Sequence, residues 1–185
     1  GPERYSVCEA STKSGKTVGA LTWLIELAMG GRTGRHYLWL APIFAQARIA
    51  YRRTLVGLPR DVYSANESAM SVRLHNGATI WYKGSDNPDS IYGEDYWGVV
   101  IDEASRCRVE AWHAVRSTVS ATEGPVRIIG NVKGRRNWAY LLARRAEAGE
   151  PGMAYHKITA QDAIEAGILA SAEIEDARAL LPASV

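Results

Sequence analysis

The segment Ala10-Ser11-Thr12-Lys13-Ser14-Gly15-Lys16-Thr17 has the spacing of a phosphate-binding loop. Such a loop has a glycine, four free positions and then Gly-Lys-Ser/Thr, and this segment departs from the pattern only at Ala10. In these loops backbone N–H groups surround the phosphates, the lysine contacts the outer phosphates, and the Ser/Thr hydroxyl ligates Mg²⁺. We therefore predict that a nucleotide is bound by Ser11, Thr12, Lys13, Ser14, Gly15, Lys16 and Thr17.

A second segment, Trp97–Ile101, is an apolar run that ends in the adjacent carboxylates Asp102 and Glu103. An aspartate at the end of a buried strand holds Mg²⁺ in proteins with a phosphate-binding loop, and a neighbouring carboxylate can polarise an attacking water. The two segments together predict a site for ATP and Mg²⁺. In that site Thr17 and Asp102 hold the metal. Lys16 contacts the β- and γ-phosphates, and Glu103 activates water, so the pair of carboxylates favours hydrolysis over binding alone.

A third segment, residues 128–134, follows as an apolar run that ends in Gly130-Asn131. A polar side chain at the end of the strand after Asp102-Glu103 is well placed to sense the γ-phosphate, which makes Asn131 the candidate sensor. A glycine-assisted turn with asparagine at a turn position explains the same residues equally well. Basic residues are bunched at Arg52-Arg53, at Arg144-Arg145 and just after this segment, and each group taken alone is typical of a solvated surface.

Strands and helices alternate along the chain, which predicts an α/β fold with a mainly parallel central sheet flanked by helices. Met70–Leu74 and Ala78–Lys83 flank Asn76-Gly77 and predict an inserted β-hairpin. The first two helices are expected to bury Val18 and Phe44 on their inward faces. We expect strands at residues 4–8, 36–41, 96–101, 126–129 and 154–158, and helices at 16–29, 42–55, 109–119, 137–148, 160–166 and 171–181.

The composition is that of an ordinary globular domain of 185 residues, with 46% hydrophobic and 23% charged residues and a formal net charge of +2. This balance tolerates a nucleic-acid partner without indicating one. Neither Cys8 nor Cys107 has a metal-binding spacing, and the four histidines are isolated from one another. No apolar run is long enough to span a membrane. Gly1-Pro2 is typical of a protease-cleavage scar, so we expect residues 3–185 to form a single domain.

The combination of these segments resembles the ATPase domain of phage large terminases, the motors that package double-stranded DNA into capsids. The likeness is carried by Lys13–Thr17, by Ala41-Pro42 with Gln46, by the hairpin and Gly84–Gly93, by Val100–Ala104, and by Gly130–Trp138. It covers nearly the whole chain. The resemblance implies a fold of the ASCE or RecA-like class of phosphate-loop NTPases. It also implies Mg²⁺-dependent ATP hydrolysis that powers translocation of DNA.

The same resemblance implies a coupling segment after Asn131, with Lys133, Arg135 and Arg136 as candidate contacts to DNA. It implies further partners, namely the portal protein, the small terminase subunit and other copies of the chain in a ring. The implied location is the host cytoplasm, with transient docking on the viral procapsid and no membrane partner. Large terminases also carry a nuclease domain with clustered carboxylates, and residues 105–185 hold no such cluster, so we expect no nuclease domain in this chain.

Two departures from the family pattern leave the role of an arginine finger unassigned. The family commonly has an arginine where this chain has Tyr92, and another near Thr12, where the basic residue here is Lys13. Arg106 and Arg108 are weak substitutes. Two other functions stay open: a helicase-like ATPase with two lobes, suggested by the Ala-Pro and Asp-Glu-Ala segments, and a nucleotide-binding switch that does not hydrolyse its ligand, suggested by Ala10 and Tyr92.

Overall fold

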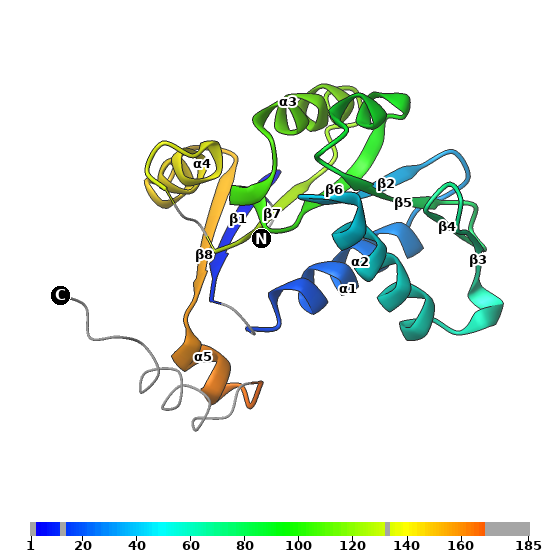
Figure 1. Cartoon of the computed structure of the whole chain (residues 1–185), viewed down its shortest axis with the longest axis horizontal. Helices are drawn as coiled ribbons and strands as arrows, with labels where there is room; N and C mark the ends of the chain where they lie inside the picture. Colours follow the sequence, from blue (N-terminus) through cyan, green and yellow to red (C-terminus); the bar gives the residue numbers. More distant parts are fainter. Residues whose placement is uncertain (1–2, 12–13, 132–133, 169–185) are drawn as a thin grey trace.

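The computed structural model describes residues 3–11, 14–131 and 134–168. Within these ranges the chain forms one eight-stranded sheet with the strand order β3-β4-β5-β2-β6-β7-β1-β8 (Figure 1). The strands are β1 (Tyr5–Ala10), β2 (His36–Ala41), β3 (Tyr63–Asn66), β4 (Ser71–Leu74), β5 (Thr79–Gly84), β6 (Tyr96–Ile101), β7 (Val126–Gly130) and β8 (Met153–Ile158). The helices are α1 (Lys16–Met29), α2 (Phe44–Gly57), α3 (Val109–Thr118), α4 (Trp138–Glu147) and α5 (Ala160–Glu165), with short 3-10 turns η1 (Arg60–Val62), η2 (Pro88–Gly93) and η3 (Ala104–Arg106).

Six neighbouring strands of the sheet are parallel, which confirms the predicted α/β fold. β1 lies between β7 and β8, β6 lies between β7 and β2, and β2 also pairs with β5, all in parallel register. The carboxyl ends of these strands therefore share one edge, where open α/β sheets bind their ligands. The predicted helix at residues 171–181 lies outside the described residues.

Two helical layers cover the sheet. Buried side chains of α1 and α2, among them Leu24 and Tyr51, pack on one face with Trp39 and Ile80. On the other face, α3 and α4 pack on Leu38, Leu40, Val99 and Ile128, and Figure 1 shows α3 and α4 on the opposite side of the sheet from α1 and α2. β2 and β6 are thus buried on both faces, which explains their nearly continuous apolar sequence.

The predicted hairpin is confirmed, and it forms part of a three-stranded antiparallel extension of the sheet. β4 pairs with β5, and β3, which the sequence analysis did not predict, pairs with β4. The turn has three residues: Gly77 N donates to Leu74 O at 2.9 Å, and only Gly77 of the turn is left-handed, with φ of 83°. This is the three-residue hairpin that ends in a glycine. β3 was missed because three of its four side chains are exposed, which leaves it without an apolar pattern.

Two expected core positions are wrong. Val18 is 59% exposed and Phe44 is 42% exposed, whereas Leu21, Leu24 and Ala47 on the same helices are buried. Both residues belong to the first turn of a helix at the carboxyl edge of the sheet. A first turn at that edge projects beyond the sheet, so periodicity alone assigns its side chains to a core that does not extend so far.

The hairpin turn is attached to α1 by one side chain. Asn76 Nδ2 donates to the carbonyl oxygens of Ala28 at 2.9 Å, Met29 at 2.9 Å and Gly31 at 3.3 Å. Its Oδ1 accepts from Ala78 N at 2.9 Å. The carbonyls at a helix end have no intrahelical partner, so Asn76 supplies the C-cap of the helix that carries the phosphate-binding loop at its other end.

We expect Asn76→Ala to lower the free energy of unfolding by about 1–3 kcal/mol, because it removes the amide that donates to all three carbonyls, while only the Ala28 carbonyl is known to keep a backbone donor, the N–H of Gly31. Urea unfolding followed by circular dichroism measures the change. His75→Ala is the matched control, since His75 is exposed in the same turn and should change the stability by less than about 0.5 kcal/mol. Equal effects of the two substitutions would contradict the capping role.

Candidate nucleotide-binding site

The phosphate-binding segment connects β1 to α1 at the carboxyl edge of the sheet. Gly15 precedes the helix with φ of 78°, a left-handed conformation that glycine adopts without strain. The hydroxyls of Ser11 and Ser14 are buried and have no hydrogen-bond partner in the described part of the chain. Buried donors of this kind fit a loop whose partner is a bound phosphate. Thr12 and Lys13 lie outside the described residues.

The carboxylates follow β6, beside the ends of β2 and β7. Asp102 N donates to Leu40 O at 2.8 Å, which continues the ladder between β6 and β2. Glu103 then turns the chain into η3 with φ of 47° and ψ of 48°. This left-handed conformation is uncommon for a residue with a side chain and is found most often at functional positions. It directs the Glu103 side chain toward the phosphate-binding segment, as the next contact shows.

Lys16 and Glu103 form an ion pair that joins the two segments. The distance between Lys16 Nζ and Glu103 Oε1 is 3.3 Å, and the two side chains are 8% and 31% exposed. Lys16 Nζ also donates to Ser11 O at 3.4 Å. Two segments that are 87 positions apart in the sequence (103 − 16) are therefore in direct contact. The predicted phosphate-binding lysine and the predicted water-activating glutamate belong to one site.

The charge balance around Asp102 suits a divalent cation. The pKa of Asp102 is raised to about 6, chiefly by burial and also by the negative charge of Glu103, against the opposing effects of the hydrogen bond from Glu103 N and the charges of Lys16 and Arg53. A cation beside Asp102 would offset both unfavourable effects. A carboxylate such as Asp102 together with the hydroxyl of Thr17 is a donor set that fits Mg²⁺, which keeps several waters and takes few protein ligands.

Two small cavities meet at Thr17. The first, of about 160 Å³, lies between α2 and the carboxylates, and the second, of about 260 Å³, lies over the start of α1. The first is lined by Thr17, Pro42, Gln46, Ile49, Ala50, Arg53, Asp102 and Glu103. The second is lined by Ser14, Gly15, Lys16, Thr17, Val18 and Arg53. The structure therefore brings both proposed metal ligands, Thr17 and Asp102, to one cavity.

The sequence analysis missed the contribution of α2 to this site. Gln46, Ile49, Ala50 and Arg53 follow the i, i+3, i+4, i+7 spacing of one helix face, and that face borders the cavity beside Asp102. The spacing was visible in the sequence, but the apolar residues of the adjacent face indicated only packing. The positions considered for an arginine finger lie elsewhere. Tyr92, which stands where the family commonly has an arginine, and the substitutes Arg106 and Arg108 are exposed and line neither cavity.

Asn131 follows β7 but does not line either of the two cavities. Its carbonyl accepts a hydrogen bond from Ser105 Oγ at 2.9 Å. The preceding Gly130 has φ of 154°, and a Cβ there would lie 3.1 Å from Ala104 N. The glycine at the end of β7 thus allows a close approach to η3, while the turn explanation and a sensor role for Asn131 both stay predictions.

The segment after Asn131 is hydrogen-bonded to the turn that follows the carboxylates. Asn137 Nδ2 donates to Ser105 O at 2.8 Å, and Trp138 Nε1 donates to Cys107 O at 2.9 Å. Asn137 also caps α4 by accepting from Ala139 N at 2.9 Å. These hydrogen bonds join the start of α4 to the turn that follows Glu103. Arg135 and Arg136 are exposed in this segment, and Lys133 lies outside the described residues.

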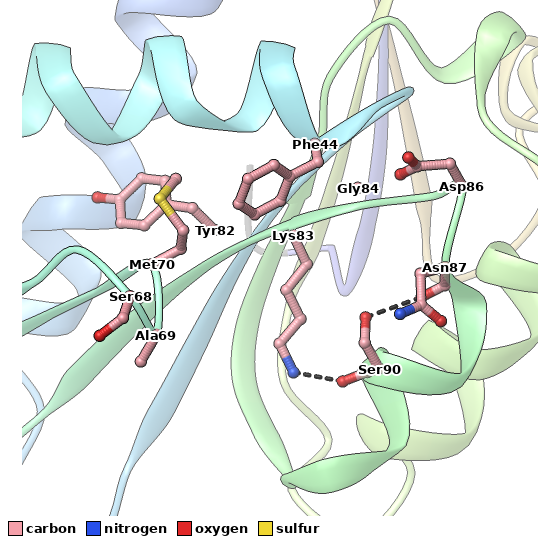
Figure 2. A pocket seen from close by; sticks show the side chains of 10 residues that line it. All are labelled: Phe44, Ser68, Ala69, Met70, Tyr82, Lys83, Gly84, Asp86, Asn87 and Ser90. Atoms are coloured by element: carbon pink, nitrogen blue, oxygen red, sulfur yellow. Dashed lines mark hydrogen bonds between the residues drawn. The ribbon is translucent and has the colours of Figure 1, made fainter.

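A third cavity, of about 390 Å³, lies farther along the same edge, between the start of α2 and η2. Figure 2 shows Phe44 and Lys83 at this cavity, with the Lys83 amine donating to the Ser90 carbonyl. Burial lowers the pKa of Lys83. No residue that lines this cavity lines either of the cavities at Thr17, so it is separate from the nucleotide-binding site.

The arrangement of these elements matches solved structures of phage packaging proteins. The ATPase domain of the Thermus phage P74-26 large terminase superposes with a TM-score of 0.82 and 20% identity, covering 98% of this chain and 85% of that one. The large terminase of a thermophilic bacteriophage, in complex with ADP, superposes with a TM-score of 0.77 and 16% identity over 98% of this chain. The fold is that of a large terminase ATPase domain.

The HK97 bacteriophage large terminase gives a TM-score of 0.73 at 14% identity, covering 84% of this chain and 35% of that one. This chain also spans only 46% of the large terminase solved with ADP. No protein-family model and no curated protein sequence matches the chain. The likeness to large terminases is therefore one of fold, and the residues described above supply the chemical argument.

The pKa of Asp102 predicts how Mg²⁺ binding changes with pH. Since the pKa is raised to about 6 from 3.8, the metal-free folded state favours the protonated carboxyl, and its contribution to stability falls as pH rises from about 4 to about 6. Mg²⁺ must displace that proton, so we expect the affinity for Mg·ADP to fall by up to about tenfold per pH unit below pH 6.

Fluorescence titration of a labelled ADP with Mg²⁺ between pH 5 and pH 8 measures this dependence. Asp102→Asn is the matched control, since it retains the titration of the nucleotide's own phosphates and lacks the carboxyl. The variant should bind more weakly at pH 8 and depend less on pH. A wild-type pH profile that coincides with that of Asp102→Asn would contradict the assignment.

Proposed function

We propose that this chain is the ATPase domain of a phage large terminase, and that it hydrolyses ATP with Mg²⁺ to move double-stranded DNA into a capsid. The ion pair between Lys16 and Glu103 is the observation that carries this proposal. It brings the phosphate-binding loop and the two carboxylates to one site, on the fold of a large terminase ATPase domain. One such large terminase, from a thermophilic bacteriophage, is solved both with ADP and with ATP-gamma-S, which supports nucleotide binding here.

Four side chains have separate roles in the proposed reaction. Lys16 contacts the β- and γ-phosphates, and the N–H groups from Ser11 to Thr17 surround them. Thr17 and Asp102 hold Mg²⁺, which would neutralise charge on the phosphates when bound. Glu103, released from Lys16 by the incoming phosphates, orients a water and accepts its proton. The water oxygen bonds to the γ-phosphorus while the bridging oxygen departs with ADP, so the products are ADP and inorganic phosphate.

The coupling of hydrolysis to DNA would run through residues 130–138. Asn131 would report the loss of the γ-phosphate, and the hydrogen bonds of Ser105, Asn137 and Trp138 support the idea that this segment follows any movement at Glu103. Arg135 and Arg136 are exposed in the same segment. Together with Lys133 they are the proposed contacts to DNA phosphates.

The wider assembly follows from the same proposal. Residues 3–185 would fold into one ATPase domain. In a DNA-packaging motor of this family, identical copies of the chain would form a ring that docks on the portal protein, with the small terminase subunit as a further partner. The work would take place in the host cytoplasm, at the procapsid. No helix in the described part of the chain has the length and apolar character to cross a membrane.

Two rival functions make different predictions. A helicase-like ATPase would separate DNA strands, and would need a second lobe to complete the site. A switch module would bind ATP without releasing phosphate. The position of Glu103 favours hydrolysis over the switch, because a carboxylate held by the phosphate-binding lysine is poised beside the proposed γ-phosphate.

We expect Glu103→Gln and Lys16→Ala each to lower the rate of ATP hydrolysis by at least about 10²-fold. The two variants should differ in nucleotide affinity. Glu103→Gln removes the charge that holds Lys16 away from the phosphates, so ATP binding should be retained or tightened, whereas Lys16→Ala should weaken it. Single-turnover hydrolysis with the protein in excess, together with equilibrium ATP binding, measures both effects.

Glu110→Gln is the control for these variants, since Glu110 is exposed on α3 and should leave hydrolysis unchanged. Unchanged turnover in Glu103→Gln would overturn the proposed role of that residue. Wild-type protein that binds ATP and releases no phosphate, even with DNA, would favour the switch function. Strand separation coupled to hydrolysis would favour the helicase-like function.

A further inference from the structure

Arg53 is a basic residue of α2 that lies at the phosphate-binding site. It lines the cavity beside Asp102 and also the cavity over the start of α1, and Thr17 is the other residue common to both. Lys16 is the only other Lys or Arg among the residues that line these two cavities. Arg53 therefore faces the space between the proposed metal ligands and the phosphate-binding loop.

Packing of its neighbours fixes the direction in which α2 presents Arg53. Ala50 and Thr54, one turn before and one residue after it, are 3% and 1% exposed. Thr54 Oγ1 contacts the Ala50 carbonyl at 3.1 Å and the Tyr82 hydroxyl at 2.7 Å. The helix face that carries Gln46, Ala50 and Arg53 is thereby held against the site, while the long arginine side chain keeps the freedom to reach toward a ligand.

The guanidinium of Arg53 has no hydrogen bond and no ion pair within the described residues, and its side chain is exposed. The amide oxygen of Gln46 is also buried without a partner in the same cavity. Two polar groups of one helix face are thus directed at the cavity and unpaired.

We propose that Arg53 contacts the γ-phosphate of ATP from within the same subunit and stabilises the charge that develops on it during hydrolysis. This inference rests on the proposed function, because it assigns a further residue to the same reaction. As the bond between the γ-phosphorus and the bridging oxygen breaks, negative charge spreads over the γ-phosphoryl oxygens. A guanidinium binds such oxygens with two parallel N–H donors, which Lys16 cannot provide.

The assignment fills the arginine role that Tyr92 leaves open in this chain. An arginine in cis would come from the same subunit as the phosphate-binding loop and the carboxylates. One subunit would then supply all the charged groups of its own site. Arg52 supplies the internal comparison. It is the next residue on α2, is also exposed, and lines neither of the cavities at Thr17.

The test measures the binding of Mg·ADP and of Mg·ADP with aluminium fluoride, which mimics the transferring phosphoryl group, to wild type, Arg53→Ala and Arg52→Ala. Arg53→Ala should lose about 10- to 100-fold in affinity for the aluminium fluoride complex, the effect of one charge-assisted hydrogen bond. Its affinity for Mg·ADP should be nearly unchanged. Arg53→Lys should recover only part of the loss, and Arg52→Ala should behave as wild type. Thermal unfolding of each variant confirms that it is folded.

Hydrolysis by Arg53→Ala should fall by a similar factor, about 10- to 100-fold, because the same contact to the transferring phosphoryl group is lost. Equal affinities of Arg53→Ala and wild type for the aluminium fluoride complex would overturn the role of Arg53 and leave the proposed function intact. Equal losses in Arg53→Ala and Arg52→Ala would overturn it too, since they would indicate a general effect of helix charge. Failure of the wild type to bind either ligand would overturn the proposed function, and the role of Arg53 with it.

Discussion

The ion pair between Lys16 and Glu103 is the contact around which the site is organised. It joins the start of α1 to the end of β6, and the parallel register of β1, β7 and β6 is what brings these ends together. Within the pair, Lys16 neutralises the carboxylate of Glu103, which would otherwise repel phosphates. Incoming phosphates compete for Lys16 and would release Glu103 when its function is needed. One contact thus links nucleotide binding to the readiness of the proposed base.

The backbone of Glu103 has a left-handed conformation that is strained for a residue with a side chain. A left-handed glutamate costs of order 1 kcal/mol, and it persists because neighbouring contacts hold it. Gly130 packs against its backbone, Asp102 accepts from its N–H, and η3 continues from its carbonyl. The same turn is hydrogen-bonded to residues 137 and 138 at the start of α4. A change at the nucleotide can therefore reach the proposed DNA-coupling segment through a short, continuous set of contacts.

The sequence predicted the fold well wherever a segment is buried on both faces or carries a strong local signal. The bounds of α1, β2 and β6 agree with the predicted ranges, because apolar periodicity and the Gly30-Gly31 stop define them. Val18 and Phe44 were misplaced because periodicity cannot show where the sheet ends. The proximity of Lys16 to Glu103 was predicted because the two segments together are typical of one nucleotide site. The position of Arg53 at the two cavities was not predicted, since it depends on how α2 is rotated against the sheet.

The most direct test of the account is a crystal structure of the protein with Mg²⁺ and a non-hydrolysable ATP analogue. We expect the amine of Lys16 to leave Glu103 and to contact the β- and γ-phosphates, with Mg²⁺ held by Thr17 and Asp102. We also expect Glu103 to face a water in line with the γ-phosphorus. An analogue bound at another cavity, or a Lys16–Glu103 pair that persists beside bound phosphates, would contradict the proposed site.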